Sequence, residues 1–208
     1  MVQLIVYPLE DFPLDHPALQ SILSSIGDAP QVLLVLRKGN MPAGSCYTNV
    51  DKNVKNSGGS IIFGWMIEWF PGVFINAMHH AVWQRPDGSF IDVTAPQNRI
   101  DTEGAETTFV VDSTISVNLD APLPVTDRHA VLVKDKDLLE AIKYYRINNN
   151  ARRELLETAA KDPRYVLSPA GLSGPPPNET YPKINSTMND SFSKIHFYRR
   201  RVLRRYSK

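Results

Sequence analysis

The chain contains a single cysteine, and its position favours nucleophilic chemistry. Cys46 follows Gly44-Ser45, which resembles a helix start, and it occupies the first position of a predicted helix. There the unpaired backbone N–H groups and the helix dipole favour a thiolate. The same N–H groups can bind an oxyanion. The alternative interpretation is a small buried apolar residue. The predicted apolar stripe of this helix consists of Tyr47, Val50 and Val54, and Cys46 is not part of that stripe.

Two adjacent histidines, His79 and His80, offer a base for this thiol. They precede the segment 85–89, Arg-Pro-Asp-Gly-Ser, which is typical of a three-residue hairpin loop with a glycine in the left-handed region. In such a hairpin the paired residue numbers sum to 174, so His80 and Asp92 are diagonal neighbours on one face. His79 then points to the other face. A two-residue loop at Asp87-Gly88 would favour His79 instead.

Cys46, His80 and Asp92 therefore form a candidate catalytic triad. Cys46 would attack a carbonyl carbon, His80 would carry the proton, and Asp92 would fix the tautomer and orientation of the ring. Taken singly, His80 could be a strand histidine bonded to a backbone carbonyl, and Asp92 could cap the loop after its strand. A zinc site that adds His79 is the chemical alternative, but adjacent strand residues face opposite ways. We expect no metal and no organic cofactor.

The order cysteine, histidine, aspartate resembles that of the papain-like superfamily, in its transglutaminase-like and arylamine N-acetyltransferase branch. The likeness extends to a group of uncharacterised bacterial and phage proteins and covers about residues 40–98. It implies an α+β core with a nucleophile helix packed on an antiparallel sheet, and a triad, but no substrate. Pro96 comes later than the proline of that family. The segments that carry the resemblance are Cys46-Tyr47-Thr48-Asn49-Val50, Gly64-Trp65, Glu68, His80-Ala81-Val82-Trp83, Asp87-Gly88 and Asp92-Val93-Thr94.

Further candidates for the site are polar or aromatic residues near the triad in sequence. Asn40 lies six residues before Cys46, where the papain family has an oxyanion-hole glutamine, and Asn49 lies one turn after it. Three tryptophans and a glutamate could line a substrate cleft. Packing of a sheet core is the alternative for these four: Trp65, Glu68, Trp69 and Trp83.

The predicted elements that position these residues describe an α+β domain. Hydrophobic spacing predicts helices ending at Ile26, over 45–57, from 135 or 137 to 145, and over 151–160. The last two could form one helix or break at the asparagine run 148–150. Strands are expected at 2–7, 32–36, 60–69, 73–84, 89–94, 107–111, 115–119 and 129–133.

Composition and charge suggest one catalytic domain with an appendage. A hydrophobic share of 42% and a charged share of 22% fit a soluble globular protein. We find no signal peptide and no apolar run long enough to span a bilayer, and we expect a cytoplasmic protein. Six prolines between 163 and 182 predict an extended segment, so we divide the chain into a catalytic domain, 1–162, and a C-terminal part, 163–208.

The segment 191–208 carries seven Lys or Arg residues and no acid, on a chain whose net charge is +1. We expect a solvated basic tail. The alternative function is a non-catalytic module that binds nucleic acid or anionic lipid through this tail. An enzyme would be inactivated by Cys46→Ala, whereas a tail-dependent binder would be inactivated by deletion after about Asp190.

The sequence thus predicts a cysteine-dependent hydrolase, a peptidase, amidase or deamidase, that acts through an acyl-Cys46 intermediate. Acyl transfer of the transglutaminase or acyltransferase type is the second possibility, because water and an amine use the same triad. The substrate is expected to be a peptide, a protein side chain or a small-molecule amide.

Overall fold

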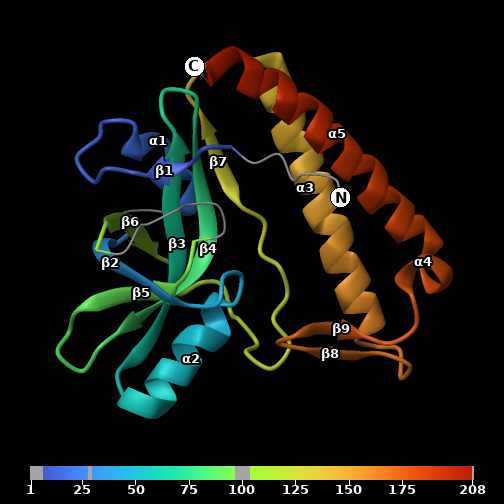
Figure 1. Ribbon diagram of the computed structural model, residues 1–208, viewed down its shortest axis with the longest axis horizontal. Helices are drawn as coiled ribbons and strands as arrows, with labels where there is room; N and C mark the ends of the chain where they lie inside the picture. Colours follow the sequence, from blue (N-terminus) through green and yellow to red (C-terminus); the bar gives the residue numbers. More distant parts are fainter. Residues whose placement is uncertain (1–6, 28–29, 97–103, 208) are drawn as a thin grey trace. The chain divides into compact units, whose positions relative to one another are not determined.

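The computed structural model describes residues 7–27, 30–96 and 104–207 (Figure 1). It is a mixed α+β structure that divides into two compact units. The sheet unit comprises 8–116 and 127–132, and the helical unit comprises 1–7, 117–126 and 133–208. This division differs from the expected boundary at residue 162, because the long helix before that point packs with the C-terminal helix. The strand expected at 2–7 lies almost wholly outside the described residues.

The sheet unit contains one large sheet and two helices. In chain order its elements are β1 (Glu10–Asp11), α1 (Leu19–Ile26), β2 (Val32–Met41), α2 (Cys46–Ser57), β3 (Ser60–Phe70), β4 (Phe74–Gln84), β5 (Phe90–Thr94), β6 (Glu106–Val111) and β7 (Arg128–Val131).

The strands of this unit pair around a closed ring. β3 pairs with β6, β6 with β2, β2 with β5, β5 with β4, and β4 with β3 again. The short strands β1 and β7 extend β3 and β4. The expectation of an antiparallel sheet is wrong in one place: β2 and β5 run parallel, because the chain crosses through α2, β3 and β4 between them.

The loop between β4 and β5 has the predicted three-residue geometry. Trp83 pairs with Ile91, which gives the expected sum of 174. The N–H of Arg85 donates to the carbonyl of Ser89, and Gly88 has φ +86°, a value that favours glycine. The hairpin register, and with it the facing of every side chain on β4 and β5, is therefore as the loop sequence predicts.

Two apolar clusters lie on the two faces of this sheet. One comprises Val35, Met66, Val82 and Phe109, which all face the inside of the strand ring. The other joins Val50 of α2 to alternate residues of β4 and β5: Ala81, Ile91 and Val93. Helix α2 therefore packs on the outer face of β4 and β5, through the apolar stripe that its sequence predicts.

The helical unit contains α3 (Lys136–Ala159), a small hairpin of β8 (Val166–Ser168) and β9 (Gly171–Ser173), α4 (Pro177–Thr180) and α5 (Pro182–Tyr206). Helix α3 runs through the asparagine segment without a break, and the Asn148 amide donates to the Ser191 hydroxyl of α5 at 3.0 Å. The strand expected at 115–119 is irregular chain. The proline-rich segment forms the hairpin and α4 in addition to turns.

The basic C-terminal segment is a helix and not a solvated tail. Figure 1 shows α3 and α5 side by side, and Ile195 and Val202 of α5 are buried. Arg205 pairs with Asp135 and Asp137, and Arg201 with Asp137, so the end of α5 neutralises the acidic start of α3.

Candidate functional site

His80 and Asp92 form a buried ion pair on the inner face of the strand ring. The Nε2 atom of His80 lies 2.9 Å from Oδ1 of Asp92, and both residues are at most 5% exposed. The same Oδ1 accepts the N–H of Thr94 at 3.0 Å. The diagonal placement that the hairpin register predicts is therefore short enough for a direct hydrogen bond.

Arg37 binds the other oxygen of this carboxylate. Its Nη1 donates to Oδ2 of Asp92 at 2.9 Å, and the two residues are partners in the parallel pairing of β2 with β5. Burial acts to raise the pKa of Asp92, but the charges and hydrogen bonds of His80 and Arg37, with the N–H of Thr94, lower it below its ordinary value. Asp92 is therefore held as a carboxylate.

Cys46 lies next to His80, beside a stretch of β4 whose edge is unpaired within the described residues. β4 pairs with β5 at Trp83 and Gln84, and with β7 from Phe74 to Ala77. Between those stretches the backbone of β4 is not paired on this side within the described residues. His80 and the backbone N–H of Ala81 both act on the Cys46 thiol and lower its pKa, so these two groups lie next to the sulfur.

The electrostatics of the pair favour a thiolate and an imidazolium. Burial acts to raise the pKa of Cys46, but the charge and hydrogen bond of His80 and the N–H of Ala81 lower it overall. Burial acts to lower the pKa of His80, but the Cys46 thiolate and Asp92 raise it to about 10. Because Nε2 of His80 is bonded to Asp92, Nδ1 is the ring nitrogen left for the sulfur. Cys46 as a residue is of intermediate exposure.

The first turn of α2 is not capped by a side chain. Ser45 is the N-cap residue, as predicted, but its hydroxyl makes no capping hydrogen bond. Its carbonyl accepts the N–H of Asn49 at 2.9 Å. The N–H groups that precede this bond, those of Cys46, Tyr47 and Thr48, are the ones that a helix leaves without intrahelical partners.

His79 lies on the outer face, as the hairpin register predicts, and bonds to the helix instead of to the triad. Its Nδ1 lies 2.7 Å from the hydroxyl of Tyr47. Burial lowers the pKa of His79 to about 4, and it raises the pKa of Tyr47 above its ordinary value. The neutral imidazole of His79 therefore accepts a hydrogen bond from the hydroxyl of Tyr47. Trp65 meets this ring edge to face, with centroids 5.1 Å apart.

Asn49 fastens the start of α2 to two other segments. Its amide donates to the carbonyl of Pro42 at 2.8 Å and to the hydroxyl of Thr94 at 3.0 Å, and the residue is 5% exposed. Thr94 in turn donates its N–H to Asp92. The structure thus places Asn49 in a chain of hydrogen bonds that leads to the carboxylate, with its amide donors engaged.

The other sequence candidates have separate surroundings. Asn40 is exposed near the end of β2. Trp65 is 1% exposed and donates to Asp112 at 2.8 Å, so it belongs to the core, and Trp83 donates to the carbonyl of Gly58 beyond α2. Glu68 binds Arg37 at 3.2 Å. Trp69 contacts the ring of Phe12 edge to face and the ring of His16 at a tilt.

Arg37 and the N–H of Ala81 are the site groups that the sequence did not predict. Arg37 has one possible signal, since it lies two residues after Val35 and shares its face. The N–H of Ala81 has none, because a backbone group carries no residue-type information.

Comparison with protein-family models, with curated proteins and with solved structures gives no match for this chain. Two properties of the described residues concern ligands and membranes. No group of three or more His, Cys, Asp or Glu side chains there is arranged to hold a metal ion. Among the helices of that part of the chain, none combines the length and the apolar character needed to cross a bilayer.

Proposed function

We propose that the protein is a cysteine-dependent hydrolase of papain-like or transglutaminase-like type that acts on an amide or thioester through an acyl-Cys46 intermediate. The observation that carries the proposal is a cysteine at a helix start that lies next to a histidine whose Nε2 binds a buried aspartate. That arrangement is the nucleophile, base and orienting group of a triad.

The chemistry follows from these contacts. The Cys46 thiolate attacks the carbonyl carbon, and a sulfur–carbon bond forms while the carbonyl becomes an oxyanion. The uncapped N–H groups at the start of α2 stabilise that charge. The imidazolium of His80 gives its proton to the leaving amine or thiol as the carbon–leaving-group bond breaks.

The second half of the reaction releases the enzyme. His80, now neutral, takes a proton from water, and the resulting hydroxide equivalent attacks the thioester carbon. The sulfur leaves as thiolate, the carboxylic acid product departs, and His80 is again protonated. Asp92 stays ionised throughout and holds the ring by Nε2.

The first test is the pH dependence of Cys46 alkylation by iodoacetamide, in the native protein, His80→Ala and His79→Ala. The chain has no other cysteine, so the label reports this site alone. We expect labelling to begin well below pH 8.5 in the native protein and in His79→Ala, and to return to an ordinary thiol profile in His80→Ala. A native thiol that titrates near pH 8.5 would refute the proposal.

Acyl transfer remains the second form of the same chemistry, with an amine in place of water. The two are separated by reacting the protein with an activated ester and measuring its intact mass. A mass increase on Cys46 that decays in buffer alone indicates hydrolysis. Decay that requires an added primary amine, with formation of its amide, indicates transfer.

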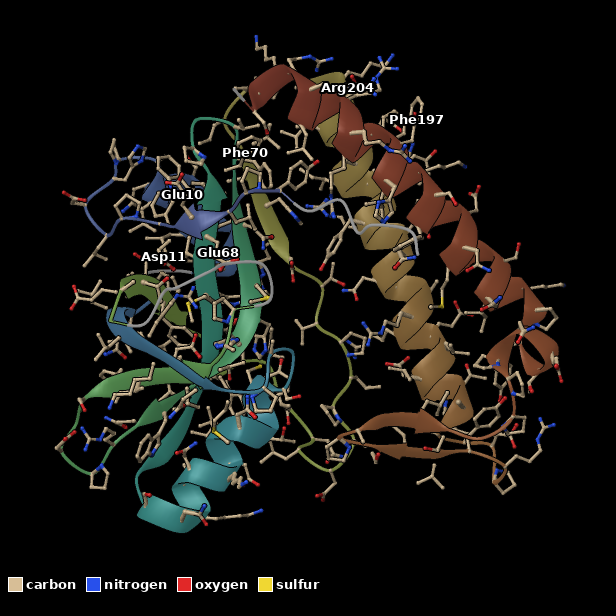
Figure 2. The ribbon with its side chains drawn as sticks, viewed as in Figure 1. Glu10, Asp11, Glu68, Phe70, Phe197 and Arg204 are labelled. Carbon is tan, nitrogen blue, oxygen red and sulfur yellow. The ribbon has the colours of Figure 1, made fainter. Side chains whose placement is uncertain are left out.

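A second candidate function concerns the outer face of α5. Phe197 is 52% exposed, and Arg200 and Arg204, one and two turns further on, are exposed with no ion pair among the described residues (Figure 2 labels Phe197 and Arg204). We propose that this face binds a single-stranded nucleic acid, because exposed guanidinium groups contact phosphates and an aromatic ring stacks on bases. An anionic bilayer fits less well, since Ile195 and Val202 are turned inward.

This face is tested by the double variant Arg200→Glu/Arg204→Glu, since deletion after Asp190 would remove most of α5 and its packing on α3. Binding of a labelled oligonucleotide in low salt should be lost in the double variant and kept in Lys161→Glu, a surface control. Binding to vesicles containing phosphatidylserine, without oligonucleotide binding, would refute this candidate.

A further inference from the structure

We infer that Arg37 is a positioning residue of the proposed active site: it holds the Asp92 carboxylate ionised and turned so that one oxygen faces His80. The inference rests on the proposed function. The bond geometry divides the carboxylate between two partners, with Oδ2 on Arg37 and Oδ1 on His80, each at 2.9 Å.

The guanidinium group of Arg37 is buried, and its orientation is fixed by its hydrogen bonds. Arg37 is 3% exposed, and its planar group has all three nitrogens engaged by carboxylates. A buried arginine without partners would be very costly, so these bonds fix the side chain in one orientation. Its contact with Asp92 is therefore part of the fold and not a surface encounter.

Two further carboxylates bind the other two nitrogens of the Arg37 guanidinium. Asp11 accepts from Nε at 2.9 Å and lies 2.7 Å from Nη2, and Glu68 accepts from Nη2 at 3.2 Å. These residues are partners in the pairing of β1 with β3, and Figure 2 labels both. Because Asp11 and Glu68 bind Nε and Nη2, the guanidinium keeps one orientation, in which Nη1 binds Asp92.

The charge of Arg37 sets the direction of the expected effect. Without Arg37, the Asp92 carboxylate would lie near the carboxylates of Asp11 and Glu68 with no arginine charge between them. Removing a positive charge makes every nearby group easier to protonate, because it destabilises anions and stabilises cations. Loss of Arg37 should therefore move the ionisation of the Cys46 thiol to higher pH, besides releasing the carboxylate from its orientation.

The experiment compares the alkylation profile of native protein with Arg37→Met, Arg37→Lys and Glu68→Gln. We expect the midpoint of labelling to rise by about one pH unit in Arg37→Met. Arg37→Lys keeps the charge and should stay near the native midpoint. Glu68→Gln leaves the bond from Arg37 to Asp92 in place and should not raise it. Circular dichroism checks that each variant is folded.

Arg37→Met leaves three carboxylates together and could unfold the sheet unit. The double variant Arg37→Met/Asp11→Asn removes one charge of each sign, and it should still raise the midpoint because Arg37 touches Asp92 directly. A folded variant without Arg37 that keeps the native midpoint would overturn the inference, as would an equal rise in Glu68→Gln. An ordinary thiol profile in the native protein would instead refute the proposed function.

Discussion

The hydroxyl of Tyr47 lies 2.7 Å from Nδ1 of His79, directly beside the pairing of Cys46 with His80. The two contacts join consecutive residues of α2 to consecutive residues of β4. One lies on the outer face of β4, and the other lies beside the stretch of its edge that is unpaired within the described residues. The outer contact therefore fixes the first turn of the helix against the strand that carries the base, which is what a nucleophile at a helix terminus requires.

Tyr47→Phe should destabilise the sheet unit by about 1–2 kcal/mol, because it leaves a buried imidazole nitrogen without its donor. All three tryptophans lie in that unit, so urea unfolding followed by tryptophan fluorescence reports it separately from the helical unit. Tyr198→Phe, in the helical unit, is the control and should leave the fluorescence transition unchanged. An unchanged midpoint in Tyr47→Phe would show that the hydrogen bond contributes nothing.

His79 should make the sheet unit sensitive to mild acid. Its pKa is about 4 in the fold and about 6.5 in the unfolded chain, so between these values the unfolded chain binds a proton that the folded chain does not. The stability from neutral His79 is complete above pH 6.5 and is lost as the pH falls towards 4, by up to about 3 kcal/mol. His79→Gln should therefore show a flatter decline over that range. Parallel declines in urea titrations at several pH values would contradict this.

Gly64 should tolerate no side chain. It pairs with His80 across β3 and β4, and a Cβ atom there would lie 2.1 Å from the carbonyl oxygen of Val110. Strand β6 would have to move, so Gly64→Ala should cost about 3 kcal/mol in the fluorescence-detected unfolding. Gly27→Ala is the matched control, since nothing lies within 4 Å of its Cβ position and its φ of 167° is extended. Equal stability of the two variants would contradict the packing.

The relation of His80 to Asp92 could be predicted because it depends on local rules. A loop of known length fixes a hairpin register, and strand parity then fixes which side chains share a face. The start of α2 at Cys46 was predictable for the same reason, from a helix-start sequence and an apolar stripe.

The role of Arg37 at the site could not be predicted from local sequence rules. Two basic residues, Arg37 and Lys38, follow the apolar run of β2, and the buried one is decided by the parallel pairing with β5, some fifty residues away. The prediction that residues 191–208 form a solvated tail was wrong for a similar reason. Ile195 and Val202 are spaced for one helix face, but the charges around them dominate the composition, and their burial depends on α3.

Asp92 should be the carboxylate on which the stability of the sheet unit depends most, because it binds both His80 and Arg37. Asp92→Ala removes a partner from buried Arg37 and the carboxylate that binds Nε2 of His80, and breaking a buried pair costs about 3–5 kcal/mol. Asp92→Asn keeps the shape and an oxygen acceptor, and it should cost less. Fluorescence-detected urea unfolding at neutral pH measures both. The control is Asp190→Ala, whose exposed pair with Lys194 should contribute under about 1 kcal/mol. If Asp92→Ala lowers the free energy of unfolding no more than Asp190→Ala does, the bonds of Asp92 to Arg37 and His80 do not stabilise the sheet unit, and Asp92 serves the chemistry alone.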